Sequence, residues 1–266
     1  MKQNSRIFLV LTLLFFLIPL LVLAAQSFSA PWRFQTGAGL DWELRSYEQL
    51  LQNPMLWKAT FTSIWIGFVV LLLNVLIGVF TGKALTTVPF KGKPWVEALL
   101  LSPILIPVLA IAMGLHIFMI RAGLADTALG VIIIHLVPTV PYSIKVFHNS
   151  YQQIGRAMLE QPHILGSGFF RQLFTVELPL LKPALRSVTF LTIVISLSQY
   201  AITAVIGGGR VLTLPLVFFP FLENADASVM SAFSLWFAAI PVWMYILVEA
   251  AILLLPYSRL PWRNKR

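Results

Sequence analysis

Residues 57–82 read WKATFTSIWIGFVVLLLNVLIGVFTG, a run in which Lys58 is the only charged side chain. A helix of about 20 apolar residues is long enough to cross the ~30 Å hydrocarbon core of a membrane. The run is continuously apolar and does not alternate with polar residues, which disfavours a membrane-spanning strand. This stretch therefore predicts a transmembrane helix.

Five more stretches of the same kind lie on either side of it, at about 7–25, 96–120, 127–147, 184–206 and 229–255. The whole chain is 58% hydrophobic and 11% charged, with a mean hydropathy of +0.85. A water-soluble domain of 266 residues with this composition would expose large apolar patches. We therefore expect an all-α integral membrane protein, one domain over residues 1–266 with six transmembrane helices.

The first of these stretches follows Lys2 and Arg6, so a cleaved signal peptide is an alternative. Signal peptidases favour small residues at the first and third positions before the cut. Cutting after Ala25 places Leu23 at the third position, and Ser27 with Ser29 is the one weak pair that fits. The sequence favours an uncleaved first helix.

The positions of Lys and Arg predict the orientation, because loops rich in these residues stay in the cytoplasm. With both termini inside, the inner segments carry fourteen of the nineteen Lys and Arg, and the outer segments carry five. Both ends are therefore expected to be cytoplasmic, together with the loop at 149–183. The net charge of +9 is thus a signal of topology and does not indicate nucleic-acid binding. The chain has no cysteine, which excludes disulfides and thiolate chemistry.

The loop at 149–183 is too long for a simple turn. Within it, Gly166 suits the left-handed end of one helix, and Ser167 suits the cap of the next. In that second helix Phe170, Leu173 and Phe174 recur at helical spacing on one face, and Arg171, Gln172 and Thr175 point elsewhere. Pro179 and Pro183 are expected to end the helix and redirect the chain. The sequence predicts two short helices joined at a glycine, outside the bilayer.

The spacing in this loop resembles the cytoplasmic loop motif of binding-protein-dependent ABC importer permeases. Glu160 stands at the acidic position, Gly166 at the glycine, Val176 at the aliphatic position, and Leu178 with Pro179 at the closing pair. Residues 47–63, 99–115 and 197–215 are similar to other parts of the same family. The last of these is most similar to the branch that imports iron(III), thiamine, polyamines, sulfate or molybdate.

The resemblance implies that two permease subunits, identical or related, form a pathway across the bacterial inner membrane. It also implies a separate ATP-binding subunit on the cytoplasmic loop, so this chain would not itself hydrolyse ATP, and a periplasmic substrate-binding protein on the outer face. No cofactor is implied. Exposed aromatic side chains on a short helix are costly unless a partner covers them. The expected ATPase-coupling residues are Glu160, Gly166, Phe169, Phe170, Leu173, Phe174, Leu178 and Pro179. Packing of the phenylalanines on the chain's own helices or on the bilayer surface is the alternative.

The chain departs from the family at Gln161 and Pro162, where two alanines are usual. Because proline is not expected deep inside a helix, Pro162 should lie in the first turn of the leading helix or break it.

Polar residues within spans usually face the protein interior or a pathway. The candidates for the pathway are His135, Ser196, Ser198, Gln199 and Tyr200. For His135 a hydrogen-bonded contact between helices is the alternative, and the same holds for the fifth-span residues. No two of the four histidines have the four-residue spacing that places two metal ligands on one helix face, so no metal site is expected.

Two other classes of protein compete with the permease. An ion-driven secondary transporter usually carries charged residues at the membrane midplane, and the span centres here lack acidic residues. A membrane-embedded hydrolase would need a nucleophile and a base, for example Ser102 or Ser143 with His135, but no nucleophile motif surrounds either serine.

Overall fold

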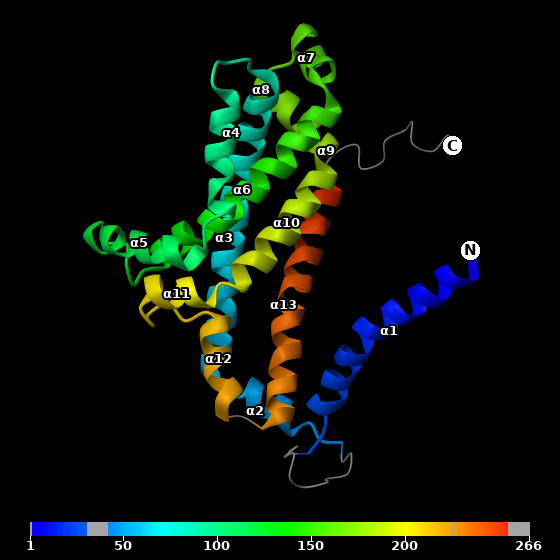
Figure 1. The fold of residues 1–266 in the computed structure, drawn as a ribbon, viewed down its shortest axis with the longest axis vertical. Helices are drawn as coiled ribbons and strands as arrows, with labels where there is room; N and C mark the ends of the chain where they lie inside the picture. Colours follow the sequence, from blue (N-terminus) through cyan, green and yellow to red (C-terminus); the bar gives the residue numbers. More distant parts are fainter. Residues whose placement is uncertain (1, 31–41, 225, 255–266) are drawn as a thin grey trace. The chain divides into compact units, whose positions relative to one another are not determined.

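The computed structural model describes residues 2–30, 42–224 and 226–254, and nearly all of them are helical (Figure 1). The described part of the chain contains no strand beyond one isolated antiparallel bridge between Ser29 and Trp42. The expected all-α fold class is confirmed. The chain divides into two compact units, residues 1–61 with 213–240 and residues 62–212 with 241–266.

The first unit contains α1 (Lys2–Ser27), α2 (Arg45–Leu51), α12 (Leu214–Asn224) and the beginnings of α3 (Pro54–Thr87) and α13 (Ala227–Leu254). Polar contacts join the residues after α1 and the start of α2 to the start of α13. The Ser29 and Ser228 hydroxyls lie 3.1 Å apart, and Arg45 pairs with Asp226. Burial alone would raise the pKa of Asp226, but hydrogen bonds from Ser228 and Arg45 hold this pKa below its ordinary value.

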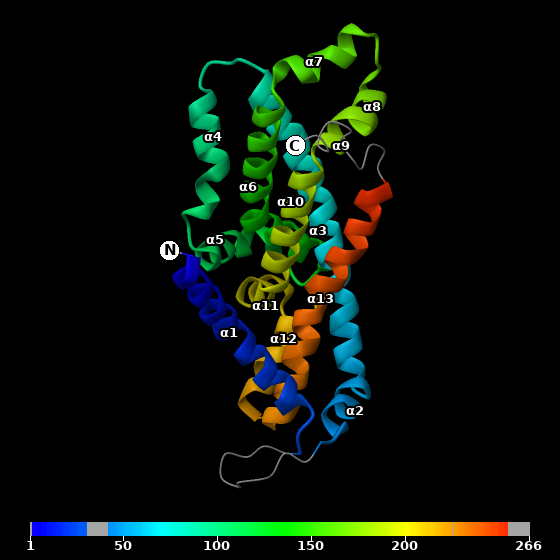
Figure 2. The same cartoon turned by 90° about the vertical axis from the view of Figure 1, so that its right-hand side faces the viewer.

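The second unit contains the remaining helices (Figures 1 and 2). They are α4 (Lys93–Leu101), the 3₁₀ turn η1 (Ser102–Ile104), α5 (Val108–Arg121), α6 (Ala128–Ile154), α7 (Arg156–Ile164), α8 (Phe169–Gln172), the π-helical turn η2 (Leu173–Glu177), α9 (Leu178–Leu180), α10 (Lys182–Leu197) and α11 (Tyr200–Gly207). The ends of α10 and α13 are joined by Arg186, whose Nε donates to both carboxylate oxygens of Glu249 at 2.8 and 3.0 Å.

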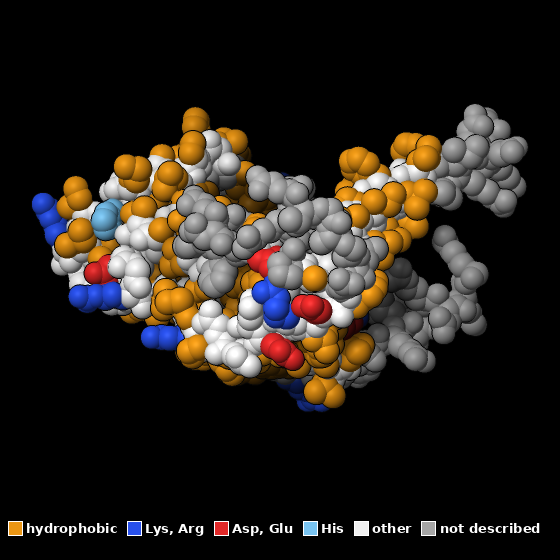
Figure 3. Space-filling model, turned by 90° about the horizontal axis from the view of Figure 1, so that it is seen from below, with side chains coloured by type: hydrophobic (Ala, Val, Ile, Leu, Met, Phe, Trp, Pro, Cys, Tyr) orange, Lys and Arg blue, Asp and Glu red, His pale blue; other side chains and the backbone are white. Residues whose placement is uncertain are grey.

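Of the described helices, α3, α6 and α13 are each long and apolar enough to cross a membrane. They contain the predicted spans 57–82, 127–147 and, as far as residue 254, 229–255. The predicted first span lies in α1, whose apolar part at Leu11–Ser27 is shorter. Figure 3 shows hydrophobic side chains over much of the described surface on this face, with acidic and basic side chains gathered near its centre and at one edge.

The third predicted span is not one straight helix. The helices at Lys93–Ile104 and Val108–Arg121 meet at an angle of 97°. Pro103 lies in the 3₁₀ turn, and Pro107 precedes α5 with an extended backbone. Proline lacks the N–H that continues a helix and disfavours the helical conformation of the residue before it, so two prolines four residues apart account for the bend.

The fifth predicted span, 184–206, is also broken, because α10 ends at Leu197 and α11 begins at Tyr200. The carbonyl of Ile195 accepts hydrogen bonds from the Ser198 hydroxyl at 2.8 Å and from Gln199 Nε2 at 3.0 Å. These side chains compete with the backbone N–H that would otherwise bond this carbonyl, which favours a helix end here. The α11 helix then ends at Gly207, and its C-cap Gly208 has a left-handed backbone.

Two glycines of α3, Gly78 and Gly82, bring α3 and α6 into close contact. A Cβ atom at Gly78 would lie 2.5 Å from the Phe147 ring, and one at Gly82 would lie 2.8 Å from the backbone nitrogen of His148. Next to them, Asn74 donates to Thr139 Oγ1 at 2.8 Å. Small residues and interhelical hydrogen bonds of this kind hold helices together in membranes.

We predict that Gly82→Ala destabilises the protein by about 1–3 kcal/mol, because the added methyl group meets backbone that cannot move without separating the two helices. Gly114→Ala is the matched control, since Gly114 lies inside α5 and an added Cβ would meet nothing within 4 Å. Thermal unfolding in detergent would compare the two variants. Equal stability of both would contradict the close contact.

Candidate functional site

Residues 156–180, here called the two-helix segment, contain the motif found in the sequence. Its first helix, α7, follows Gly155 at φ 80° and ends just before Gly166 at φ 78°. The Gly166 N–H donates to His163 O at 3.0 Å, and the Ser167 N–H donates to Pro162 O at 2.9 Å. This pair of bonds is the Schellman arrangement, in which a left-handed glycine closes a helix. The predicted left-handed helix end at Gly166 is confirmed.

The prediction for Pro162 is wrong. It is the seventh of the nine residues of α7 and neither starts nor breaks the helix. The missing N–H removes a single intrahelical bond near the helix end, where the next backbone groups are already bonded by the closing turn. The carbonyl of Pro162 is itself one of the acceptors of that turn.

The second helix runs from Phe169 through a π-helical stretch to Leu180. Gly168 is its N-cap and no side chain bonds the first turn, so the expected cap by Ser167 is wrong. The π-helical turn precedes Pro179, whose ring would clash with the Thr175 carbonyl in a regular α-helix. Pro179 thus does not end the helix. The chain turns by 75° at Leu181, between the two prolines that were expected to redirect it, and Pro183 lies in the first turn of α10.

Several large apolar side chains of the two-helix segment are exposed. The fractional exposures are 80% for Ile164, 85% for Leu165, 72% for Phe170, 52% for Phe169 and 51% for Phe174. Sequence reasoning missed Ile164 and Leu165, although both directly precede Gly166 and so belong to the turn that closes α7. The segment thus presents five exposed apolar side chains among its charged and polar ones.

The other expected residues of this segment are less exposed or differently placed. Leu173, Leu178 and Pro179 are half-buried. Phe169 stacks on Phe80 of α3 with ring centroids 6.2 Å apart, so one of the phenylalanines packs partly on the chain's own helices. Glu160 is exposed, and its Oε1 lies 3.7 Å from Nε of Arg156 one turn earlier.

A hollow of about 430 Å³ lies between the two helices of the segment. Its lining combines apolar side chains with polar ones from both helices, namely Met158, Gln161, Pro162, Leu165, Gly166, Ser167, Arg171 and Val176. The residues in which this chain departs from the family motif, Gln161 and Pro162, therefore face a concave surface.

Behind the exposed surface lies a buried acidic residue that sequence reasoning missed. Glu177 is 1% exposed, and its carboxylate accepts hydrogen bonds from Lys83 Nζ at 2.6 Å, Gln172 Nε2 at 2.9 Å and the Tyr151 hydroxyl at 2.9 Å. One signal was available in the sequence, since Glu177 is the only acidic residue between Glu160 and Glu223. A buried carboxylate needs such donors because an unpaired charge is very costly inside a protein.

The residues expected to line a pathway divide into two groups. His135 is buried, and its two ring nitrogens each lie 2.9 Å from a hydroxyl, that of Ser196 before the break in the fifth span and that of Thr203 after it. This is the geometry of a helix-contact histidine. Ser198 is exposed, and Gln199 and Tyr200 are half-buried, all three at the break.

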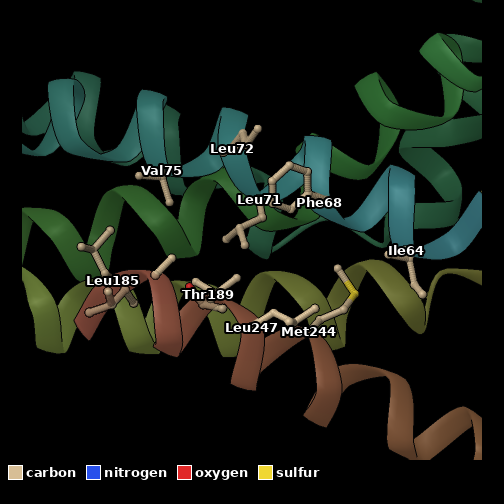
Figure 4. Close-up of a pocket in the computed structure, with 12 residues that line it drawn as sticks. Ile64, Phe68, Leu71, Leu72, Val75, Leu185, Thr189, Met244 and Leu247 are labelled. Atoms are coloured by element: carbon tan, nitrogen blue, oxygen red, sulfur yellow. The ribbon is translucent and has the colours of Figure 1, made fainter. Parts of the chain in front are cut away.

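A groove of about 340 Å³ lies between α3, α10 and the end of α13 (Figure 4). Its lining is apolar apart from Thr189, with side chains such as Phe68, Leu72, Met244 and Leu247. It lacks the convergent polar groups by which a binding site orients a polar ligand.

We predict that Gly166→Ala loosens the junction of the two helices, since the left-handed conformation costs a non-glycine residue about 1–2 kcal/mol. Gly168→Ala is the matched control, because Gly168 has φ −69° and open space around it. Hydrogen exchange of the amides of residues 156–175 should accelerate about five- to thirtyfold in the first variant only. If the exchange rates stayed unchanged in both variants, residue 166 would not require the left-handed conformation.

Comparison with known proteins gives one consistent group of relatives. Residues 74–258 match the family model described as binding-protein-dependent transport system inner membrane component. The spermidine/putrescine transport system permease protein PotC of Haemophilus influenzae is 27% identical over 240 residues, which cover 88% of this chain and 92% of that protein. The putative 2-aminoethylphosphonate transport system permease protein PhnV of Salmonella typhimurium is 24% identical over 242 residues, 90% of each chain.

The fold has solved counterparts as well. The crystal structure of a bacterial ABC transporter involved in the import of the acidic polysaccharide alginate contains a chain that superimposes with a TM-score of 0.69 at 17% sequence identity. The superposition covers 94% of this chain and 95% of the other.

Proposed function

Since the chain belongs to the family of binding-protein-dependent transport system inner membrane components, we propose that its two-helix segment is the surface on which a separate ATP-binding subunit docks. The chain is a permease subunit of an ABC import system, as its sequence relatives are. This family membership favours the permease over the two other classes considered from the sequence, an ion-driven transporter and a membrane-embedded hydrolase.

The exposed apolar surface of the two-helix segment is the observation that carries this proposal. Phe170 and Leu165 expose 72% and 85% of their area next to charged and polar residues, outside the long apolar helices. Apolar area of this kind, rimmed by polar side chains, is characteristic of a protein interface. Aromatic residues in its centre are the usual hot spots.

We infer that the segment lies in the cytoplasm, together with both termini. The excess of Lys and Arg in the segments on that side supports this orientation. In the proposed topology the chain crosses the inner membrane six times, and the bent pair α4–α5 and the broken pair α10–α11 each count as one crossing.

The proposed assembly contains this chain, a second permease that is identical or related, a separate ATP-binding subunit and a periplasmic substrate-binding protein. Hydrolysis of ATP takes place on the ATP-binding subunit. A second solved structure shows a bacterial alginate ABC transporter in complex with an alginate pentasaccharide-bound periplasmic protein. This chain matches a chain of that complex with a TM-score of 0.65.

We propose that the break at Ser198 and Gln199 borders the translocation pathway, with Tyr200 beside it and His135 and Ser196 behind it. Breaks in membrane helices are tolerated where the freed backbone groups are buried in protein or line a water-filled cavity. The relatives carry names that refer to polyamines and to 2-aminoethylphosphonate. A polar or charged cargo delivered by a binding protein fits this break better than the apolar groove of Figure 4.

We predict that Phe170→Asp lowers the amount of ATP-binding subunit that co-purifies with this permease about tenfold or more. Truncation or charging of a hot spot costs about 2 kcal/mol or more of binding free energy. Gly166→Pro should act in the same direction, because proline has a fixed negative φ and cannot take up the positive φ of this residue.

The control for this experiment is Phe90→Asp, which charges another exposed phenylalanine in the loop between α3 and α4. Both variants should insert into the membrane at parental levels. If the ATP-binding subunit still co-purifies fully with the Phe170 variant, docking occurs elsewhere.

A further inference from the structure

A buried carboxylate links the two-helix segment to two of the long helices. Glu177 belongs to the π-helical turn of the segment, Lys83 lies near the end of α3, and Tyr151 lies near the end of α6. One carboxylate oxygen accepts from Lys83 and Gln172, and the other accepts from Tyr151. The carboxylate therefore bonds three separate elements at once.

The π-helical turn is what brings the two polar residues of the segment together. Gln172 and Glu177 are five residues apart, and in an α-helix of 3.6 residues per turn they would point in directions about 140° apart. A π-helical turn closes its hydrogen bonds between residues five apart, so such residues lie nearly above one another. Gln172 Nε2 thereby reaches Glu177 Oε1 at 2.9 Å and also donates to the Leu159 carbonyl of α7 at 2.8 Å.

The carboxylate itself is buried from water, whereas the Lys83 side chain that pairs with it is 25% exposed. Glu177 is 1% exposed, Tyr151 is fully buried and Gln172 is 8% exposed. The Phe169 ring covers the site from the segment side, with Lys83 Nζ 5.7 Å from its centroid and Phe80 stacked on it. A charge in such a place is tolerated only in the arrangement that satisfies it, so moving the segment away from α3 and α6 would leave Lys83 or Glu177 without its partner.

We propose that Glu177 is a positioning residue that makes the two-helix segment move as one rigid body with α3 and α6 during transport. The proposal rests on the docking function proposed above, because it names the route by which movement of a docked ATP-binding subunit reaches the membrane helices. Lys83 and Tyr151 are the residues that receive this movement in the two spans.

The chain contains no cysteine, so a pair of nitroxide labels can be placed without background. Arg171→Cys and Leu76→Cys place the labels on exposed positions of the segment and of α3, respectively. Double electron–electron resonance spectroscopy would measure the distribution of distances between the two labels in the permease alone. It would then be repeated in the complex with the ATP-binding subunit, with and without AMP-PNP.

We expect a narrow distribution in the parent, with the same mean distance in all three states. Glu177→Gln and Lys83→Met should broaden it at least twofold and make its mean shift when AMP-PNP binds. Lys83→Arg keeps the cation and should restore the parental behaviour. Tyr151→Phe removes a single hydroxyl, is the variant least able to disturb folding, and should give an intermediate width.

Glu48→Gln is the control, because it is the same chemical change on an exposed residue of α2, outside the surface proposed for docking. It should leave the distribution unchanged. The proposal is overturned if Glu177→Gln retains the parental width and mean, even if that variant is less stable to heat. Failure of docking is a separate outcome, because the ATP-binding subunit would then be missing from the purified parent while the labels in the permease alone still report the attachment.

Discussion

In the hydrocarbon core of a membrane every backbone N–H and C=O group must find a partner within the protein. This constraint explains why nearly all described residues are helical, and it bears on the two spans that are broken. At the break in the fifth span, Ser198 and Gln199 take over the carbonyl of Ile195. At the bend in the third span, Pro107 occupies the position before α5 and contributes no N–H that would need a partner.

The sequence predicted those features that depend on composition or on a single residue type. Long apolar runs were sufficient for α3, α6 and α13, and the conformation of Gly166 followed from its place between two helices. The bend of 97° and the break at 198–199 were missed because mean apolarity continues across them. Two local features distinguish these broken spans from straight ones. They are the spacing of two prolines in the third span and the side chains that compete for a backbone carbonyl in the fifth.

Within the two-helix segment, too, the sequence did not predict features that depend on local helix geometry. The exposed phenylalanines follow from a helical period, but the burial of Gln172 and Glu177 does not, because it depends on a π-helical turn that shifts the period by one residue. Pro162 was misplaced for a related reason. The cost of a proline depends on which helical bond it removes, and near a Schellman turn the missing bond is of small consequence.

The close contact of α3 and α6 determines how movement of the two-helix segment can reach the membrane. A bond to one isolated helix would let that helix rotate or slide against its neighbour, and the movement would be lost between them. Here Gly78 and Gly82 hold α3 against Phe147 and His148 of α6, and Lys83 and Tyr151 lie just beyond this contact on the two helices. Glu177 bonds both of them, so it contacts two helices that pack closely against each other. Because packed helices resist deformation, a small displacement at the surface of the segment is carried into the spans as a movement of the pair.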